Sequence, residues 1–446
     1  MFKKIFSYPV FLFLFITLIG LMGFGSIIKY HYEGGKKYQF FQKPVILISS
    51  IPLAIKEMIR HRSINLYDIE NALPKLEKHK TKNRFKKFIN SNRNGLLILP
   101  RYEHTLSRAV VDIIDLNDFQ IIHTYKHEID KMNEKVVNSN EFPRLKIDNS
   151  PMRFLYQHPI ILNDGSLISI YGPAYKIDFC SNLIWINDEE IFHHSQEIDH
   201  EGNIWVGGQM NPKSKIVKEN SLKGYADDSI IKINTKGKIL FNKSVTEILI
   251  ENNVVDKNIL NSGNDPIHLN DIEPALKNTK FWKKGDLFLS PRNQSAILHY
   301  RPSTNKIINF IKGPFSQQHD VDIISDEEIS IFNNNNFFSN NEYSEVVIYN
   351  FKTKEFSTLF NKQLQKFNFK TETNGLSQIL NDGSLMVEEQ NHGRILLFNN
   401  LGKIEWEFVN KDKNGDIGHI KWSRIIEDEG FINKFKLLVG NNKCID

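Results

Sequence analysis

Residues 158–172, HPIILNDGSLISIYG, are the clearest copy of the pattern that decides the fold. They read as an apolar strand, an Asn-Asp-Gly turn and a second strand rich in β-branched residues, which is typical of a β-hairpin. Residues 193–208, HHSQEIDHEGNIWVGG, and 374–390, NGLSQILNDGSLMVEEQ, repeat the same order. Two further short strands follow each copy, so a unit of four strands recurs along the chain. Such a repeat predicts the blades of a β-propeller.

Five copies are complete, and the sixth is split between the two ends of the repeating region. Residues 94–125 supply a second, third and fourth strand, whereas residues 422–431 supply a first strand with no blade after it. We therefore expect residues 422–426 to complete the first blade and to close the ring, which removes exposed sheet edges. The prediction is an all-β fold, a six-bladed propeller over residues 94–430, with a C-terminal tail at 431–446.

The N-terminal region differs from the repeats. Residues 8–28, YPVFLFLFITLIGLMGFGSII, form an apolar stretch about long enough to cross a bilayer as a helix. No A-x-A-like cleavage signal follows, so residues 1–29 are expected to be an uncleaved transmembrane signal-anchor. Lysines flank the stretch on both sides and leave its orientation open. Residues 30–93 carry longer periodic stretches and are predicted to be a helical linker.

Charge and cysteine content narrow the classes further. The net charge is +5 over 446 residues. Much of the excess lies at residues 75–87 and does not continue into the repeats, so no nucleic acid is expected as a partner. That run fits a solvated helix face or contact with anionic lipid. The two cysteines, Cys180 and Cys444, form no CxxC motif and are either one disulfide or two separate thiols.

Polar residues gather where the first strand of a blade starts and where its second strand ends. These two points lie at the same mouth of the ring, because the two strands form an antiparallel hairpin. Counting eight residues back from the turn glycine gives equivalent positions in three blades, and the fourth blade contributes from both of its strands. The residues are His194, His319, Gln157 with its neighbour His158, and then His268, Asn270 and Arg292. His193 is the alternative to His194, because a slip of one residue exchanges the two faces of a strand.

Three histidines beside an arginine limit the chemistry. Three imidazoles can bind a metal ion, but an arginine repels cations and suits forked binding of a sulfate or phosphate. A neutral histidine can act as nucleophile or base. No GxxxxGK[ST] loop is present, so a nucleotide held by a P-loop is not supported. The group favours transfer of an anion, and no metal or cofactor is assigned.

At these residues the sequence resembles the bacterial arylsulfotransferase family. The matching stretches are HHSQEIDHEGNIWV, IHLNDI followed by GDLFLSPRNQSAI, QHDVDII, and residues 374–410. Together they span residues 154–425. The resemblance implies a six-bladed propeller in the periplasm that transfers a sulfuryl group from a phenolic sulfate ester to another phenol. It implies no adenosine-phosphosulfate donor.

The resemblance also implies roles for individual residues. His319 is expected to be the nucleophile that becomes transiently sulfated, and His268 and Arg292 to bind and neutralise the transferring group. His194 is expected to act as acid or base, with Asn270, His193 and His158 contacting the substrate. The interval between Arg292 and His319 is short compared with the better-known members.

Two other functions stay open at this point. One is a non-catalytic propeller, tethered to the membrane, that binds an anionic ligand, and the other is a metal-dependent hydrolase. The expected location is the inner membrane, with a single span and the propeller on the periplasmic side. A homo-oligomer is left open.

Overall fold

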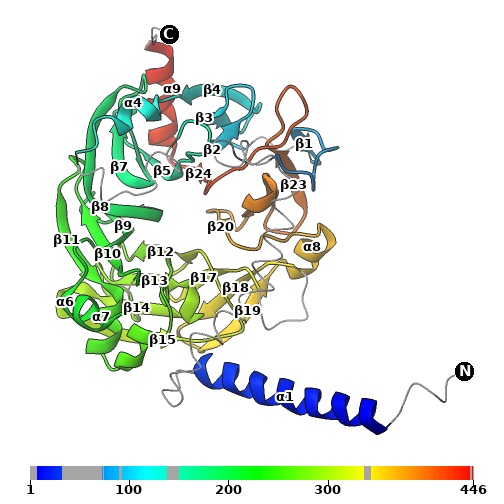
Figure 1. Ribbon diagram of the computed structural model, residues 1–446. Coiled ribbons are helices and arrows are strands. Elements are labelled where there is room, and N and C mark those ends of the chain that lie inside the picture. Colours follow the sequence, from blue (N-terminus) through cyan, green and yellow to red (C-terminus); the bar gives the residue numbers. More distant parts are fainter. Residues whose placement is uncertain are drawn as a thin grey trace, which may run out of the picture.

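The computed structural model describes residues 8–32, 73, 75–89, 93–137, 150–222, 224–335, 343–441 and 444. Their strands form five antiparallel sheets arranged in a ring around a central axis (Figure 1). The prediction of an all-β propeller is confirmed. Apolar side chains of neighbouring sheets pack between them and form the core, as at Leu97, Met386 and Trp406.

The ring is closed by a strand from the C-terminal end of the repeats. The closing sheet has the order β24-β2-β3-β4. Its strands are β24 (Arg424–Ile426), β2 (Leu96–Glu103), β3 (Arg108–Asp115) and β4 (Gln120–Tyr125). In β24, Ile425 lies opposite Leu97 of β2. The predicted closure by residues 422–426 is therefore confirmed.

The next sheet has seven strands in sequence order. They are β5 (Gln157–Ile161), β6 (Leu167–Ile170), β7 (Gly172–Ile177), β8 (Leu183–Ile198), β9 (Ile204–Gln209), β10 (Asp228–Ile233) and β11 (Ile239–Ser244). Strand β8 pairs with β7 along its first part and with β9 along its last part. It contains 16 residues and no glycine or proline that would break it. The described residues therefore form five sheets where six blades were predicted, because β8 runs on continuously within one seven-stranded sheet.

The other three sheets follow the predicted four-stranded pattern. One consists of β12 (Leu269–Pro274), β13 (Leu287–Pro291), β14 (Ile297–Arg301) and β15 (Lys306–Ile311). The next consists of β16 (Val321–Ile323), β17 (Glu328–Asn333), β18 (Glu345–Asn350) and β19 (Glu355–Leu359). The last consists of β20 (Leu376–Ile379), β21 (Leu385–Glu389), β22 (Arg394–Phe398) and β23 (Ile404–Val409), with β1 (Phe85–Lys87) added at its outer edge.

Strand β1 corrects the prediction of a helical linker at residues 30–93. Most of that segment, residues 33–72, lies outside the described residues. In its last part residues 78–81 form a turn, β1 pairs antiparallel with β23, and Lys82 Nζ lies 2.7 Å from Glu407 Oε1. The edge of an outer strand offers unpaired backbone groups, and β1 covers this edge.

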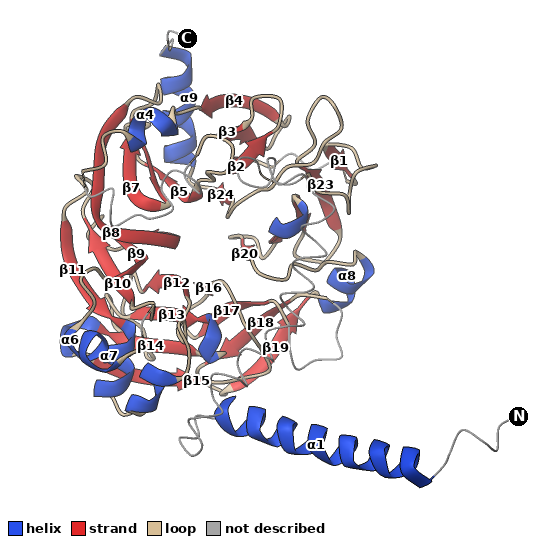
Figure 2. Ribbon diagram, in the orientation of Figure 1, coloured by secondary structure: helices blue, strands red, loops and turns tan. Residues whose placement is uncertain are grey.

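Short helices lie at the periphery of the ring (Figure 2). They are α4 (Ile129–Asn133), α6 (Lys215–Asn220), α7 (Val245–Glu251) and α8 (Asn361–Lys366). Single 3-10 turns occur as η3 (Lys257–Asn261), η4 (Arg292–Gln294), η5 (Pro302–Thr304) and η6 (Gln390–His392).

The N-terminal helix α1 (Tyr8–Tyr32) covers the apolar stretch of the sequence. Within the part of the chain that the structure describes, no helix has the length and apolar character needed to cross a membrane.

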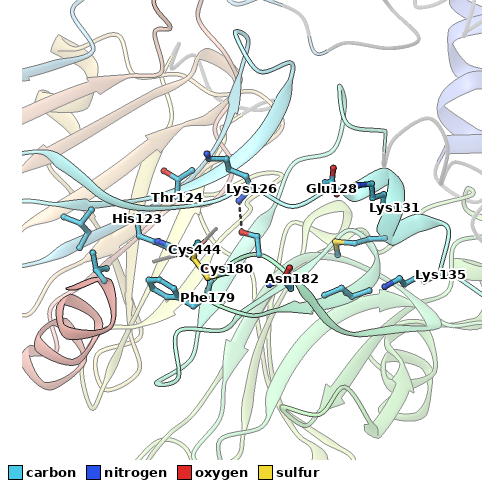
Figure 3. Close-up of a pocket in the computed structure, with 15 residues that line it drawn as sticks. His123, Thr124, Lys126, Glu128, Lys131, Lys135, Phe179, Cys180, Asn182 and Cys444 are labelled. Carbon is cyan, nitrogen blue, oxygen red and sulfur yellow. Dashed lines mark hydrogen bonds and ion pairs between the residues drawn. A yellow bond between two sulfur atoms is a disulfide. The ribbon is translucent and has the colours of Figure 1, made fainter. Parts of the chain in front are cut away.

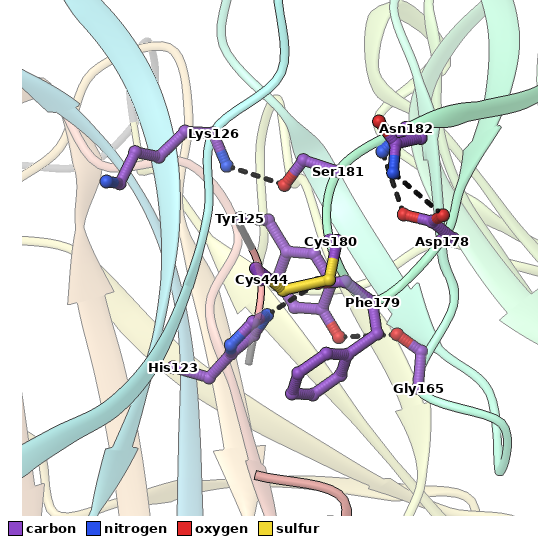
Figure 4. The surroundings of a disulfide bond; sticks show 10 residues. All are labelled: His123, Tyr125, Lys126, Gly165, Asp178, Phe179, Cys180, Ser181, Asn182 and Cys444. Atoms are coloured by element: carbon purple, nitrogen blue, oxygen red, sulfur yellow. Dashed lines mark hydrogen bonds between the residues drawn. A yellow bond between two sulfur atoms is a disulfide. The ribbon is translucent and has the colours of Figure 1, made fainter. Parts of the chain in front are cut away.

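A C-terminal helix, α9 (Glu429–Asn441), follows the closing strand. Its buried Ile432 and Phe435 pack into the apolar cluster of the first sheets, and Lys436 Nζ lies 2.5 Å from Asp115 Oδ2. Beyond it, Cys444 forms a disulfide with Cys180 in the loop before β8 (Figure 4). Of the two alternatives for the cysteines, the structure has the disulfide.

Candidate active site

Six residues with a left-handed backbone mark the starts of the inner strands. They are His158 (φ 42°), His194 (φ 64°), His268 (φ 52°), Gln317 (φ 51°), Gly375 (φ 139°) and Trp422 (φ 51°). Residues other than glycine seldom adopt this conformation, and it concentrates at functional sites where the surrounding structure imposes it. Three of the six are histidines, so the unusual backbone conformation indicates a candidate site at this mouth of the ring.

The structure brings four of the predicted residues together. The rings of His194 and His268 have their centroids 5.2 Å apart. His268 and Arg292 both lie close enough to His319 for their charges to lower its pKa. Arg292 directly follows β13, and its backbone N–H donates to His268 O at 2.9 Å. The pairing of β12 with β13 therefore places a histidine and an arginine at one edge.

His319 is fully buried, and its two ring nitrogens differ. Nδ1 lies 2.6 Å from Asn334 Oδ1, whereas Nε2 is buried and has no hydrogen-bond partner among the described residues. Burial lowers the pKa of His319 to about 3; nearby charges contribute, and the bond to Asn334 opposes the shift. The ring is neutral at ordinary pH, so one nitrogen keeps a lone pair.

His268 lies at the open side of the group, with about a third of its side chain exposed (32%). Its Nδ1 lies 2.5 Å from Asp265 Oδ2. Although burial opposes it, the hydrogen bond and charge of His268 lower the pKa of Asp265. An ionised carboxylate at Nδ1 holds the ring proton there and leaves Nε2 for a ligand.

Arg292 is held from one side only. Its Nη2 donates to Gln317 Oε1 at 2.9 Å and its Nη1 to Asn293 Oδ1 at 2.9 Å, whereas the buried Nε has no hydrogen-bond partner among the described residues. Burial lowers its pKa, but an arginine stays charged at any ordinary pH. A fixed guanidinium with an unpartnered N–H is suited to an oxyanion.

Of the two neighbouring histidines, His194 is the one whose ring contacts that of His268. Burial and then the charges of its neighbours lower the pKa of His194 well below its usual value, so it too is neutral. The ring of His193 stands edge-on to that of His194, and its Nε2 lies 3.6 Å from Asp228 Oδ1 on β10. His193 therefore lies between His194 and Asp228, which stands two strands away in the same sheet.

Asn270 and His158 are placed less directly. Asn270 Nδ2 donates to Gln318 O at 3.1 Å and joins two inner strands, while its buried Oδ1 has no hydrogen-bond partner among the described residues. The ring of His158 packs edge-on against Trp422, and its Nδ1 lies 3.3 Å from Glu197 Oε1. His158 thus stands with Trp422 and Glu197, and its contacts do not include the other three histidines.

Sequence reasoning missed Lys421, a half-buried cation of the same group. Lys421 precedes the left-handed Trp422, and its charge acts on both His194 and His319. Its Nζ donates to Asn374 Oδ1 at 2.8 Å. Burial lowers the pKa of Lys421 to about 8, and Glu388 opposes the shift. Its place in the sequence could have identified it, because Lys421 directly precedes residues 422–426, which complete the split blade.

Asn334 was also missed, although the hairpin rule points to it. It directly follows β17, as Arg292 follows β13, so it ends the second strand of its blade. Its side chain is fully buried and contacts His319. The rule that selected Arg292 in one blade selects Asn334 in the next.

Metal binding finds no geometric basis in the described part of the chain. There, no group of three or more His, Cys, Asp or Glu side chains is arranged to hold a metal ion. The ring of His194 contacts those of His193 and His268, and the charges of Arg292 and Lys421 lie near the group.

A cavity of about 760 Å³ lies elsewhere, beside the disulfide (Figure 3). It is lined by residues such as His123, Lys126, Lys131 and Phe179, and by none of the residues predicted for the site. His123 is committed to structure, since its ring stacks on Phe179 and its Nε2 lies 2.9 Å from Phe179 O. The cavity and the converging histidines are therefore separate features of the molecule.

Comparisons with known proteins identify the family of the chain. A family model described as "Arylsulfotransferase (ASST)" matches residues 152–411, which include all the residues predicted for the site. No curated protein matches the chain.

Solved structures similar to this chain are distant. A Bacteroides caccae protein of unknown function has 12% identity and a TM-score of 0.48, and the match covers 75% of this chain and 100% of that one. A streptogramin B lyase has 10% identity and a TM-score of 0.38, covering 76% and 97%. A hydrazine synthase from Kuenenia stuttgartiensis has 10% identity and a TM-score of 0.39, covering 70% and 78%. These values carry no argument about function.

Proposed function

The chain belongs to the arylsulfotransferase family, and we propose that it transfers a sulfuryl group from an aryl sulfate to a phenol through a sulfated His319. The observation that carries this proposal is the state of His319 Nε2. This nitrogen is buried, has no hydrogen-bond partner among the described residues and belongs to a neutral ring. A neutral imidazole nitrogen beside fixed cations is the arrangement that attack on an anionic ester needs.

The first half-reaction forms an N–S bond and breaks an S–O bond. Nε2 of His319 attacks the sulfur of the aryl sulfate, and the phenolate leaves with the electron pair of the S–O bond. Arg292 binds the sulfuryl oxygens, whose negative charge spreads in the transition state, and the ring of His268 lies beside them. The imidazole becomes an N-sulfo-imidazolium that keeps its proton on Nδ1, next to Asn334 Oδ1.

The departing phenolate needs a proton, and Lys421 is the better matched donor. The resemblance assigned acid–base work to His194, but the pKa of His194 lies well below its usual value, so it carries no extra proton. The pKa of Lys421, about 8, lies near that of a phenol. In the second half-reaction the acceptor phenol gives its proton back to Lys421 as its oxygen takes the sulfuryl group. We assign His194 to contact with the phenol ring or oxygen.

Mass spectrometry tests this proposal. The purified protein is incubated briefly with 4-nitrophenyl sulfate and digested. The expected result is an added mass of one SO3 group on the peptide that carries His319, lost again when a phenol is added. An adduct on another residue overturns the assignment of His319. Binding of the ester without adduct or released 4-nitrophenol favours the non-catalytic propeller.

The family resemblance also implies six blades, and the pairing of β8 supports that count. The register of β8 with β9 shifts between His193 and Gln196, just after the part of β8 that pairs with β7. Counted as the last strand of one unit and the first of the next, β8 divides the seven-stranded sheet into two units of four. We therefore count six repeats in five sheets.

An extracytoplasmic location fits the disulfide between Cys180 and Cys444, because structural disulfides persist in oxidising compartments. Alkylation of thiols in intact cells tests it, and protected cysteines are the expected result. Attachment to the inner membrane through residues 8–28 rests on the sequence alone. Extraction of membranes at alkaline pH decides it, since a spanning protein stays in the pellet.

A further inference from the structure

The buried side-chain amide of Asn334 contacts one ring nitrogen of His319 and not the other. Asn334 is fully buried directly after β17, and its Oδ1 lies 2.6 Å from His319 Nδ1. The backbone of His319 is fixed as well, because its N–H donates to Phe332 O at 3.0 Å. The imidazole therefore has little freedom to turn away from this partner.

The orientation of the Asn334 amide follows from its other contacts. Its Nδ2 donates to Thr371 O at 2.9 Å and to Asn374 O at 2.7 Å. If the amide were flipped, its oxygen would face two carbonyl oxygens and both hydrogen bonds would be lost. The oxygen therefore faces His319, and an oxygen can only accept.

An acceptor at Nδ1 dictates where the single proton of a neutral imidazole lies. The proton lies on Nδ1, and the lone pair is left on Nε2. Without this acceptor the ring is free to place its proton on Nε2, and that tautomer cannot attack through Nε2. The amide of Asn334 thus selects between a nucleophilic and a blocked form of the same ring.

The same contacts join His319 to the segment that closes the ring. Asn374 accepts twice: its backbone oxygen holds the Asn334 amide, and its Oδ1 holds Lys421 Nζ at 2.8 Å. Lys370 Nζ adds a bond of 2.7 Å to Asn334 O. Residues 370–374, which lead into β20, therefore link the imidazole of His319 to Lys421 through hydrogen bonds.

We propose that Asn334 is a positioning residue that fixes His319 in the Nδ1–H tautomer, and that Asn374 links this setting to Lys421. The proposal rests on the proposed role of His319 in transfer, and it concerns how that role is set. As the ring gains positive charge during attack, the Nδ1–H···O bond to Asn334 strengthens, so the amide acts on the transition state more than on substrate binding.

Nitrogen NMR of the imidazole rings tests the proposal without turnover. In protein labelled with ¹⁵N-histidine, the signals of His319 are those that a His319→Gln variant lacks. The expected wild-type spectrum shows a neutral ring protonated on Nδ1. A wild-type ring protonated on Nε2 overturns the proposal, whatever the protein catalyses.

Two variants of Asn334 separate positioning from structure. Asn334→Leu removes the acceptor at similar volume, and we expect loss of the Nδ1–H form with a fall in kcat of about 100-fold and KM changed by less than about 3-fold. Asn334→Asp keeps an acceptor oxygen, so we expect it to retain the tautomer and at least about a tenth of the wild-type kcat. Unchanged tautomer and kcat in Asn334→Leu overturn the proposal.

Asn187→Leu is the matched control. Asn187 is a buried amide on β8 that contacts backbone groups only, with Nδ2 2.6 Å from Gly237 O. We expect this variant to lose stability while tautomer and kcat stay as in the wild type. If Asn334→Leu does not fold, the wild-type spectrum and the Asp variant still decide. If His319→Gln keeps transfer activity, the proposed function fails while the tautomer result stands.

Discussion

The mouth of the ring and the channel beneath it are built from the same inner strands with opposite side chains. The mouth carries imidazoles and cations, whereas the next positions inward carry carboxyls, as in the neighbours His319 and Asp320. What is called the channel here is the group of carboxyls close enough to raise one another's pKa, namely Asp271, Glu273, Asp320 and Asp322. Burial lowers the pKa of His319 to about 3 and raises the pKa of Asp271 to about 7. Burial therefore favours the uncharged form of His319 in the mouth and of Asp271 in the channel.

Neutrality has a different consequence in each region. In the mouth it leaves imidazole lone pairs beside Arg292 and Lys421, which is what attack on a sulfate ester requires. In the channel it removes negative charge that would repel the same ester, because the pKa values of Asp320 and Asp322 also lie well above the usual value. In the proposed mechanism, desolvation therefore leaves the nucleophile uncharged and removes negative charge from the carboxyls of the channel.

Replacing His319, which supplies the attacking lone pair in the proposed mechanism, has the largest expected effect on activity. We expect His319→Gln to lower kcat for 4-nitrophenyl sulfate at least about 10³-fold, because no other group replaces the covalent step. Released 4-nitrophenol measures it. His200→Gln, at an exposed turn, is the control and should be indistinguishable from the wild type. Full activity in His319→Gln contradicts the assignment.

Changing the shape of a cation while keeping its charge comes next. We expect Arg292→Lys to lower kcat/KM about 10²-fold, since an ammonium cannot replace the forked N–H groups that meet an oxyanion. Steady-state kinetics with the same ester measure it. Lys277→Arg, a reciprocal exchange at an exposed ion pair with Asp326, serves as control. A loss of less than about 3-fold would show that charge alone suffices at this position.

Parts of both regions could be predicted from sequence. Alternation and Asn/Asp-Gly turns predicted the strands and the closure by residues 422–426, because these signals are local. The hairpin rule found His194, His268, His319 and Arg292. In the second blade it gave Gln157 with His158 beside it, and the left-handed backbone places His158 at the position of His194. A bulge accounts for the offset of one residue, since the register shifts between Gln157 and Ile160.

Other features depend on contacts that no local pattern carries. Strand β8 contains no glycine or proline, so nothing in its sequence marks where one repeat ends and the next begins. Strand β1 joins the outer edge of β23 across more than 300 residues of chain, as in the pair Phe85 and Phe408. The pKa values of the mouth depend on burial by neighbouring blades, and only the assembled ring provides that burial.

The pH dependence of kcat/KM tests the proposed role of Lys421. Its pKa of about 8 means that the protonated form, which the proposed mechanism needs, is lost above that pH. We expect kcat/KM to be flat from about pH 5 to 7 and to fall above about pH 8, with no acid limb near 6.5 because His319 stays neutral there. We expect Lys421→Arg to cost about 10-fold at pH 7 and to abolish the alkaline limb. An unchanged limb in the variant would assign it to another group.

The smallest expected effect on activity comes from the channel. We expect Asp271→Asn to change kcat by less than about 2-fold, because the carboxyl it replaces is already uncharged over most of the working range. Its effect should appear in stability. The folded pKa of Asp271, about 7, is raised above the value of about 3.8 in the unfolded chain. The stabilisation it contributes is therefore full below about pH 3.8 and is lost as the pH rises through 7.

Urea unfolding at pH 5 and pH 8 measures that loss. The wild type should lose more stability than Asp271→Asn between the two values, since the amide does not titrate. Asp286→Asn is the matched control. Although burial opposes it, His299 and Arg301 lower the pKa of Asp286, so the stabilisation from this carboxylate is present above its unfolded pKa and lost only in acid. Its replacement should cost the same at pH 5 and pH 8. Equal pH dependence of the wild type and Asp271→Asn would mean that Asp271 is ionised in the folded protein, and that negative charge lies beneath the mouth after all.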